Sequence, residues 1–278
     1  MASKKEKIST SAYGLRLYTD VFHLDALHFG LFDKNDPLTL DGLKIAQKRY
    51  TNRLIELIPK CVKKILDVGC GTGSNAEELI KKGYNVSCLS PDSYQEQKVK
   101  ERLSANVIFY KSKFEDFVSN EKFDLILFSE SVQYIPLKAL FSKSKDMLID
   151  GGYILASDYF RKELGKYYKT CQLVDDFFNL SKEAGFKEIY KENITERVVP
   201  TLVVGKNIYE GYALPIVNIV KDFLLERSPL FSKSVYFFFK KKFIKLENYL
   251  YKHTPDKLDK DRFLKEIVYL MCIFKKGE

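Results

Sequence analysis

The stretch that decides the fold is Lys64-Ile65-Leu66-Asp67-Val68-Gly69-Cys70-Gly71-Thr72-Gly73-Ser74-Asn75. Its apolar start predicts a buried strand over residues 65–68, and glycine at alternate positions then predicts a tight turn. A helix is expected from about Ser74, with its N-terminal amides pointing back toward any ligand that the turn holds. This order of strand, glycine turn and helix predicts an α/β fold that binds a nucleotide-like molecule.

Two positions in this stretch narrow the chemistry of the ligand. The dinucleotide-binding fingerprint has Gly or Ala at its sixth position, where this chain has Ser74. Asp67 ends the strand, where a carboxylate would repel a pyrophosphate and attract an ammonium group. We therefore expect a ligand with positive charge and no pyrophosphate. S-adenosylmethionine fits, because it carries a sulfonium and an amino-acid end.

The sequence Ile-Leu-Asp-Val-Gly-Cys-Gly-Thr-Gly over residues 65–73 resembles the first motif of class I S-adenosylmethionine-dependent methyltransferases almost letter for letter. The resemblance implies a Rossmann-like α/β sheet of seven strands, six parallel and one antiparallel. It also implies a set of cofactor-binding residues in this loop: Asp67, Gly69, Cys70, Gly71, Thr72 and Gly73. The alternative is a Rossmann-like nucleotide site of another kind. Cys70 is expected to be a small turn residue and not a nucleophile.

Length and composition limit the number of domains, the possible membrane spans and the expected compartment. The 278 residues suit one large domain with additions, and no apolar run approaches the ~20 residues that a membrane span needs. The polar segment 1–11 does not resemble a secretory signal. Five cysteines without paired spacing predict neither disulfides nor a metal site, so we expect a cytoplasmic protein.

The net charge of +9 is unevenly placed, because residues 218–278 hold 14 Lys and Arg against 8 Asp and Glu. A basic region favours an acidic partner, such as nucleic acid, anionic lipid or a phosphorylated substrate. The alternative is an ordinary solvated surface. No Asn/Asp-Pro-Pro-Tyr/Phe sequence follows the expected fourth strand (123–128), which argues against a nucleic-acid methyltransferase.

Residues 1–60 are expected to form a polar tail and a helical cap, with a helix over 41–58 that Pro59 ends. Segments 18–20 and 27–32 resemble the cap of small-molecule methyltransferases related to tocopherol, sterol and cyclopropane-forming enzymes. The resemblance implies that Tyr18 and Phe29 close over the site and contact the substrate. His28 is a candidate catalytic residue, and the alternative is a packed cap residue.

The ribose contact is open among three residues. In Rossmann-like sites an acidic residue about 20 positions beyond the glycines holds the ribose hydroxyls. Here Ser90 stands at that place, and the carboxylate of Asp92 follows two residues later. Cyclopropane-type enzymes resemble this chain in having Leu-Ser followed by a downstream Gln, which is Gln95 here. We favour Ser90, then Asp92.

The adenine contact is expected after the third strand (107–110), where Phe114 and Glu115 resemble the adenine-binding segment of the family. Ser129, directly after the fourth strand, is a further candidate cofactor contact.

Glu130 and Tyr134 follow the fourth strand and are the main catalytic candidates. The first and fourth strands flank the point where strand order reverses, so this segment faces the methyl group. In the sterol and cyclopropane relatives a glutamate here helps to handle the substrate cation or its proton, and Glu130 fits that position. The alternative for Glu130 is a capping role on the next helix. Asp158 and Tyr159, after the fifth strand (153–156), are candidate substrate contacts.

The core is expected to comprise residues 61–194 plus 263–278, with strands over 187–193 and 266–274 on either side of a helical insert, 195–262. Helices are expected at 209–226 and 235–251. The second has an apolar face and many lysines, which suits peripheral contact with an anionic membrane or packing on the domain. We interpret the insert as a lid over the substrate.

The sequence thus predicts methyl transfer from S-adenosylmethionine to a small apolar or aromatic acceptor, such as a natural product, isoprenoid, quinone or lipid. The alternatives are a cyclopropane-type or other lipid methyltransferase at a membrane surface, and a binding module without catalysis. A small-molecule acceptor is the expected partner, nucleic acid is not, and a homodimer is a further hypothesis. No metal is expected.

Overall fold

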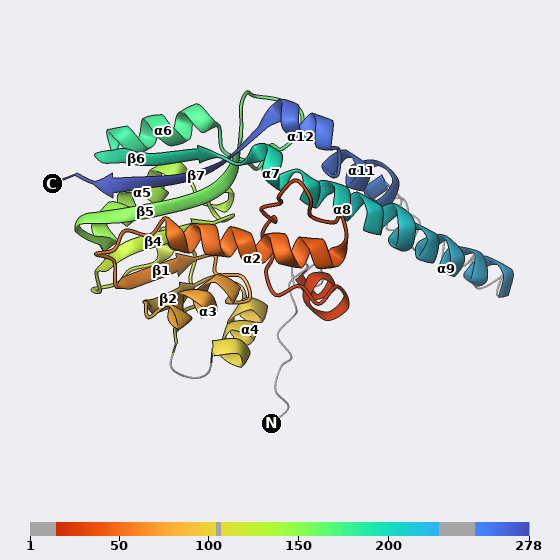
Figure 1. Cartoon of the computed structure of the whole chain (residues 1–278), viewed down its shortest axis with the longest axis horizontal. Helices are drawn as coiled ribbons and strands as arrows, with labels where there is room; N and C mark the ends of the chain where they lie inside the picture. Colours follow the sequence, from red (N-terminus) through yellow and green to blue (C-terminus); the bar gives the residue numbers. More distant parts are fainter. Residues whose placement is uncertain (1–14, 104–106, 228–247, 278) are drawn as a thin grey trace.

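A computed structural model describes residues 15–103, 107–227 and 248–277 (Figure 1). Its centre is a seven-stranded sheet in the order β3-β2-β1-β4-β5-β7-β6. The strands are β1 (Lys64–Val68), β2 (Asn85–Leu89), β3 (Ile108–Tyr110), β4 (Phe123–Ser129), β5 (Leu148–Arg161), β6 (Phe186–Asn193) and β7 (Ile267–Lys276). Only β7 runs antiparallel to its neighbours. The predicted sheet of six parallel strands and one antiparallel strand is confirmed.

Helices cover both faces of the sheet, which is why its central strands are apolar almost throughout. The helices are α2 (Leu40–Glu56), α3 (Ser74–Lys81), α4 (Ser93–Leu103), α5 (Leu137–Met147) and α6 (Val174–Glu183). Successive residues of a strand point to opposite faces, so Ile65 packs with residues of α2 and α3, while Leu66 packs with residues of α5 and α6. The two cores hold β1 and β4 rigidly in the middle of the sheet.

The fifth strand is longer than the sequence indicated. The predicted strand spanned 153–156, whereas β5 continues to Arg161. The reason is its pairing with β7, which runs without a break from Tyr153 opposite Lys275 to Arg161 opposite Ile267. Asp158 and Tyr159 are therefore strand residues with fixed directions, and not loop residues.

The insert between β6 and β7 is helical in its described part. It contains α7 (Thr195–Val198), α8 (Pro200–Ile208), α9 (Leu214–Arg227), α11 (Thr254–Lys257) and α12 (Lys260–Glu266). A π-helical turn, Tyr209–Ala213, joins α8 to α9, so the predicted helix over 209–226 begins inside a longer helical run. Of the predicted helix over 235–251, residues 235–247 lie outside the described part of the chain.

The insert packs against the cap, and α9 then extends away from the sheet (Figure 1). Val204 of α8 shares a core with Leu24 and Phe32 of the cap and with two residues of α2. The amide of Gly30 donates to the Thr201 hydroxyl at 3.0 Å. The described residues of the insert therefore support the cap from outside.

Candidate cofactor and acceptor site

A cavity of about 520 Å³ opens at the carboxyl ends of β1, β2 and β4. This is the point where strand order reverses, and ligands of open α/β sheets bind there. The predicted site residues on its wall are His28, Gly69, Cys70, Gly71, Thr72, Ser90, Asp92, Gln95, Phe114, Glu115, Ser129, Glu130, Tyr134 and Tyr159. Ala26, Leu27, Lys113, Ser131, Gln133 and Ile135 also line it and were not predicted.

The glycine turn has the conformation that its sequence demands. Gly69, Gly71 and Gly73 have φ angles of 72°, 57° and 82°, a region that side chains rarely adopt. A Cβ on Gly69 would lie 2.6 Å from Cβ of Ser131, so this glycine also lets the loop approach the segment after β4. At Gly71 the nearest atom to a Cβ would be Leu27 Cδ1 at 3.4 Å, across the cavity edge.

Asp67 supplies the strongest indication of a cationic ligand. Its side chain is buried, and Oδ2 has no hydrogen-bond partner among the described residues. Burial raises the pKa of Asp67 to about 7. The residue lies beneath the glycine turn, next to Val68 of the cavity wall, and is not itself on that wall. An unpartnered buried carboxyl at this place fits a ligand with positive charge.

The ribose candidates differ in what they already bind. Oδ1 of Asp92 accepts from the amides of Tyr94 at 2.9 Å and Gln95 at 3.0 Å, which caps the start of α4. The Ser90 hydroxyl accepts from the Asp92 amide at 3.2 Å and still has its own proton to donate. Oε1 of Gln95 is buried without a partner among the described residues. Ser90 and Gln95 thus have the capacity for a diol, while one oxygen of Asp92 is committed to capping.

The adenine candidates Phe114 and Glu115 lie side by side on the cavity wall, next to Lys113. Phe114 is buried and meets Phe128 edge-on, with ring centroids 5.2 Å apart. Glu115 lies on the wall beside Lys113, with 3.9 Å between the Lys113 ammonium and the carboxylate. An aromatic ring and a carboxylate therefore lie next to each other, and their contact with adenine stays a prediction.

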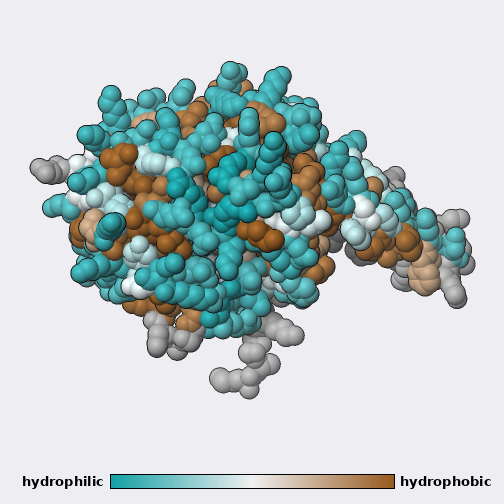
Figure 2. All heavy atoms as spheres, in the orientation of Figure 1, coloured by the Kyte–Doolittle hydropathy of each residue, from teal (hydrophilic) through white to brown (hydrophobic). Residues whose placement is uncertain are grey.

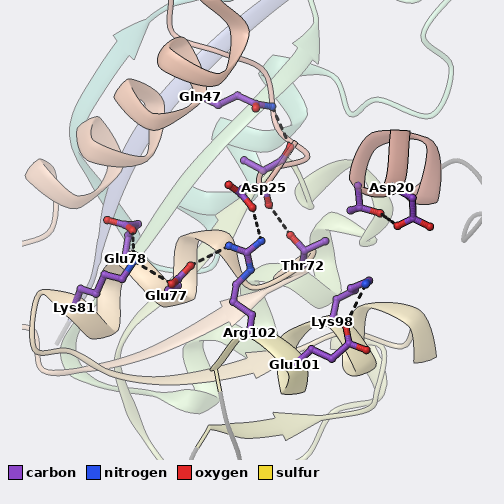
Figure 3. A network of polar contacts seen from close by, with 12 residues as sticks. Asp20, Asp25, Gln47, Thr72, Glu77, Glu78, Lys81, Lys98, Glu101 and Arg102 are labelled. Atoms are coloured by element: carbon purple, nitrogen blue, oxygen red, sulfur yellow. Dashed lines mark hydrogen bonds and ion pairs between the residues drawn. The ribbon is translucent and has the colours of Figure 1, made fainter. Parts of the chain in front are cut away.

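The cap is tied to the cofactor side of the cavity by Asp25 (Figure 3). The Thr72 hydroxyl donates to the Asp25 carbonyl at 2.7 Å, and Arg102 of α4 donates to the Asp25 carboxylate at 3.0 Å. From above, Gln47 of α2 donates to the carbonyls of Ala26 and His28. The cap segment is therefore held to the glycine turn, to α4 and to α2 at once.

Glu130 has the most unusual geometry in the site. Its φ of 55° lies in the left-handed region, which a residue other than glycine adopts only where the surroundings enforce it. Oε1 accepts from the Phe29 amide at 2.6 Å and from the Tyr269 hydroxyl at 2.7 Å. Burial raises the pKa of Glu130 to about 7, although these two donors oppose the shift. A carboxyl with this pKa can exchange a proton near neutral pH.

Two buried tyrosines behind Glu130 were not predicted as site residues. The Tyr269 hydroxyl lies 2.9 Å from that of Tyr50, which donates to Ser157 Oγ at 2.6 Å. The sequence did carry a signal for a polar contact here, because both tyrosines occupy core positions and a buried tyrosine hydroxyl needs a hydrogen-bond partner. Their sequence positions alone did not say that the partner of Tyr269 is Glu130.

His28 lies on the cavity wall with both ring nitrogens engaged. Nδ1 donates to the Phe29 carbonyl at 2.8 Å, and Nε2 lies 3.1 Å from the Thr51 hydroxyl. The ring stacks on Tyr50 with centroids 4.2 Å apart. Burial lowers the pKa of His28 to about 4, so the ring is neutral at physiological pH. This placement favours the packed cap residue over the catalytic role.

The remaining candidates divide between the cavity and its surroundings. Tyr134 is 73% exposed at the cavity mouth, and the hydroxyl of Tyr159 donates to Gln133 Oε1 at 3.0 Å on the wall. The Phe29 amide donates to Glu130, and the Phe29 ring packs against Tyr159. Phe29 is not itself on the cavity wall.

Besides Phe29, two further predicted substrate contacts are not on the wall. Asp158 is fully buried and accepts from the Val132 amide at 2.8 Å, because the extension of β5 places it on the same face of the sheet as the core residues Ala156 and Phe160. Tyr18 lies on a π-helical turn outside the cavity and is 44% exposed. None of the described residues of the insert lines the cavity either, so its role as a lid stays a prediction.

The strand order, the glycine turn and the cavity at the reversal point define an α/β protein of the Rossmann-like methyltransferase class. Residues 43–191 match the methyltransferase domain family, and the chain belongs to it. The resemblance inferred from residues 65–73 is thus confirmed, and with it S-adenosylmethionine as the cofactor. When bound, this cofactor supplies a methyl group on a sulfonium.

Related proteins act on diverse molecules. Tocopherol O-methyltransferase of Arabidopsis thaliana is 26% identical over 63% of this chain and 61% of its own length, so this chain spans under two thirds of that relative. Among solved structures, the [4+2]-cyclase SpnF has a TM-score of 0.68 at 16% identity, covering 96% of this chain and 94% of that one. The cyclopropane synthase MmaA2 of Mycobacterium tuberculosis has a TM-score of 0.63 at 15% identity, covering 98% and 100%. These structures share the fold, and fold alone does not assign a substrate.

Proposed function

We propose that the protein transfers the methyl group of S-adenosylmethionine to a small, largely apolar acceptor whose protic group faces Glu130. The observation that carries this proposal is one cavity whose wall includes both the glycine turn and Glu130. Cofactor and acceptor can then lie side by side, and holding two reactants in line contributes on the order of 7–11 kcal/mol to the lowering of the barrier. Glu130 accepts the proton that the acceptor loses.

The charge of the wall restricts the acceptor. Lys113 is the one cationic side chain among the described residues that line the cavity, and it lies beside Glu115 at the adenine end. Near Glu130 the wall includes Ser129, Ser131, Gln133, Tyr134, Ile135, Tyr159 and the neutral His28, and none of these side chains is cationic. A phosphate or diphosphate would find no cation there. We therefore favour an uncharged isoprenoid, quinone, polyketide or fatty-acyl acceptor.

Cofactor binding is expected to release a proton, because a cationic ligand favours the charged form of Asp67. With a pKa of about 7 for Asp67, titration with S-adenosylmethionine should release roughly 0.8 proton at pH 6.5 and almost none at pH 8.5. The measurement is calorimetry in phosphate and in Tris, whose different ionisation enthalpies reveal the number of protons.

Matched variants identify the source of that proton. Asp67→Asn should bind the cofactor more weakly and release no proton. Glu130→Gln should keep the release, because Glu130 has a similar pKa but is assigned to the acceptor end. If the release vanishes in Glu130→Gln and persists in Asp67→Asn, the cofactor site is assigned wrongly.

A second candidate, action at an anionic membrane surface, rests on the helix that extends from the domain. Tyr212, Ile216, Ile219 and Val220 are 51–68% exposed and recur at helical spacing. Figure 2 shows hydrophobic surface on the arm that projects from the domain. The next 20 residues of the sequence, 228–247, contain five lysines and one glutamate. In the described part of the chain no helix is long and apolar enough to cross a membrane. The chain would therefore lie on the bilayer surface.

Vesicle sedimentation tests this candidate. The full chain should bind phosphatidylserine-containing vesicles, lose binding at high salt, and bind several-fold more weakly as Ile216→Ser/Ile219→Ser. Val118→Ser, at an exposed apolar residue outside α9, is the control. Equal binding by the double variant would exclude the membrane surface. A dimer that the double variant dissociates would instead make this face a contact between two copies.

A further inference from the structure

One oxygen atom joins the cap to the sheet. Oε1 of Glu130 accepts from the amide of Phe29 in the cap and from the hydroxyl of Tyr269 in β7. Phe29 and Tyr269 are 240 positions apart in the chain, yet their rings also pack together with centroids 5.8 Å apart. In the described part of the chain, Oε2 of Glu130 has no such donor, which leaves it for the acceptor.

We propose that Tyr269 is a positioning residue for Glu130, and that the bond from the Phe29 amide makes closure of the cap depend on the charge of the Glu130 carboxyl. Tyr269 fixes Oε1, so that the carboxyl keeps one orientation in the cavity. The cap is then held most firmly over a charged Glu130 and less firmly when that carboxyl binds a proton.

The physical basis is the difference between a carboxylate and a carboxylic acid as acceptors. Hydrogen bonds to a charged acceptor contribute about 1.5–3 kcal/mol, against about 0.5–1.5 kcal/mol for neutral partners. The Phe29 amide can only donate, so its bond is strongest to the charged form, weaker when Oε2 carries the proton and Oε1 is a neutral carbonyl oxygen, and lost when Oε1 carries the proton. Cap closure and ionisation of Glu130 therefore favour each other.

Tyr269 differs from the amide because a hydroxyl can also accept. Its oxygen lies 2.9 Å from that of Tyr50, and Tyr50 donates to Ser157. With Glu130 charged, Tyr269 donates to it. With Glu130 protonated, the carboxyl can donate to Tyr269, Tyr269 to Tyr50, and Tyr50 to Ser157. The tyrosine chain is satisfied in both states, and the bond to the cap is the one that weakens.

The groups around Glu130 are acids and neutral rings. Glu130 is surrounded by six side chains from five parts of the fold: Tyr50 from α2, Asp158 and Tyr159 from β5, Tyr269 from β7, Tyr134 after β4, and His28 of the cap. Burial raises the pKa of Asp158 well above its ordinary value, and the charge of Glu130 adds to that rise. Burial keeps His28 neutral, with its pKa lowered to about 4. Glu130, with a pKa of about 7, is the carboxyl of this group that accepts directly from a cap amide.

The test follows the Phe29 amide proton by NMR in the full chain, labelled with ¹⁵N-phenylalanine, from pH 5 to 9. Its chemical shift should move downfield with one midpoint near 7 as Glu130 ionises. In Tyr269→Phe the midpoint should rise by about 1 pH unit, because the charged form loses a donor. In Glu130→Gln the midpoint near 7 should disappear.

Tyr168→Phe is the matched control. The Tyr168 hydroxyl is buried without a partner among the described residues, and its ring packs on Phe263 in the same aromatic cluster. Removing it should leave the midpoint unchanged, whereas a general loosening of the core would affect both variants. The inference is overturned if Glu130→Gln still titrates, or if Tyr269→Phe gives the midpoint of Tyr168→Phe.

Thermal unfolding of each variant distinguishes lost structure from lost positioning. Should Tyr269→Phe fail to fold, the comparison of the unaltered chain with Glu130→Gln still decides whether Phe29 senses Glu130. The inference concerns the residue to which the proposed function assigns the acceptor proton, but the experiment needs no acceptor. The proposed link between Glu130 and the cap can therefore fail while the proposed methyl transfer holds. The link can also hold in a protein that shows no methyl transfer.

Discussion

Replacing Gly71 by valine is expected to abolish binding of S-adenosylmethionine. Gly71 has a φ of 57°, and a Cβ there would already stand 3.4 Å from Leu27 at the cavity edge. The two further methyl groups of valine would occupy space that the cofactor needs. The left-handed strain lowers the stability of the fold, whereas overpacking of the cofactor space costs about 3 kcal/mol of binding free energy, which lowers affinity by roughly 100-fold. Calorimetric titration with the cofactor measures this loss.

Gly83→Val separates the effect of backbone strain from the effect of filling the cofactor space. Gly83 has a φ of 90°, so valine there carries comparable backbone strain, but no atom lies within 4 Å of its Cβ position and it is not on the cavity wall. This variant should lose stability and keep cofactor affinity. Binding of S-adenosylmethionine by Gly71→Val at the affinity of the unaltered chain would refute the placement of the cofactor.

Glu130→Gln should retain cofactor affinity and lower turnover by about 10²–10⁴-fold, the usual contribution of a general acid or base. The amide keeps the size of the side chain and an oxygen that Phe29 and Tyr269 can reach, but it cannot take up a proton. Release of S-adenosylhomocysteine with a panel of uncharged isoprenoid, quinone and fatty-acyl acceptors measures turnover. The pH dependence near 7 should disappear as well.

The control is Glu121→Gln, a half-exposed carboxylate that pairs with Lys64 and is not on the cavity wall. It should leave turnover unchanged. If Glu130→Gln loses stability and turnover in equal measure, the helix-capping role of Glu130 is the better explanation. Full turnover in Glu130→Gln would mean that the acceptor needs no base.

The sequence predicted the fold well because the decisive features were local. Residues 65–73 contain an apolar strand and three glycines at positions that require φ above zero, so the strand, the turn and the ligand side follow from a short stretch. The segment after β4 was found in the same way, since the carboxyl end of a strand next to β1 must face the cavity. Ser90, Phe114 and Glu130 all reach the wall.

The features that the sequence did not predict depend on contacts between distant parts of the chain. Tyr269 meets Glu130 only because β7 pairs with β5 and α2 covers the same face, which no local pattern encodes. Asp158 was assigned to the acceptor because β5 was expected to end before it. Pairing with β7 extends β5 past Asp158, whose side chain is buried in the core. His28 was judged by residue type, while its neutral state follows from burial beside Tyr50.

The buried acids of this site oppose the stability of the empty protein. The pKa values of Asp67 and Glu130 are about 7 in the fold and lower when the chain is unfolded, so between roughly pH 4 and 7 the folded state binds more protons. The contribution of these two acids to stability therefore falls as pH rises through that range, while the lowered pKa of His28 contributes in the opposite direction. Each of the two acids is most stabilising in its protonated form, which is least suited to its proposed role. Ligands that favour the charged acids offset part of that loss, so ligand binding and the stability of the empty chain place opposite demands on these two residues.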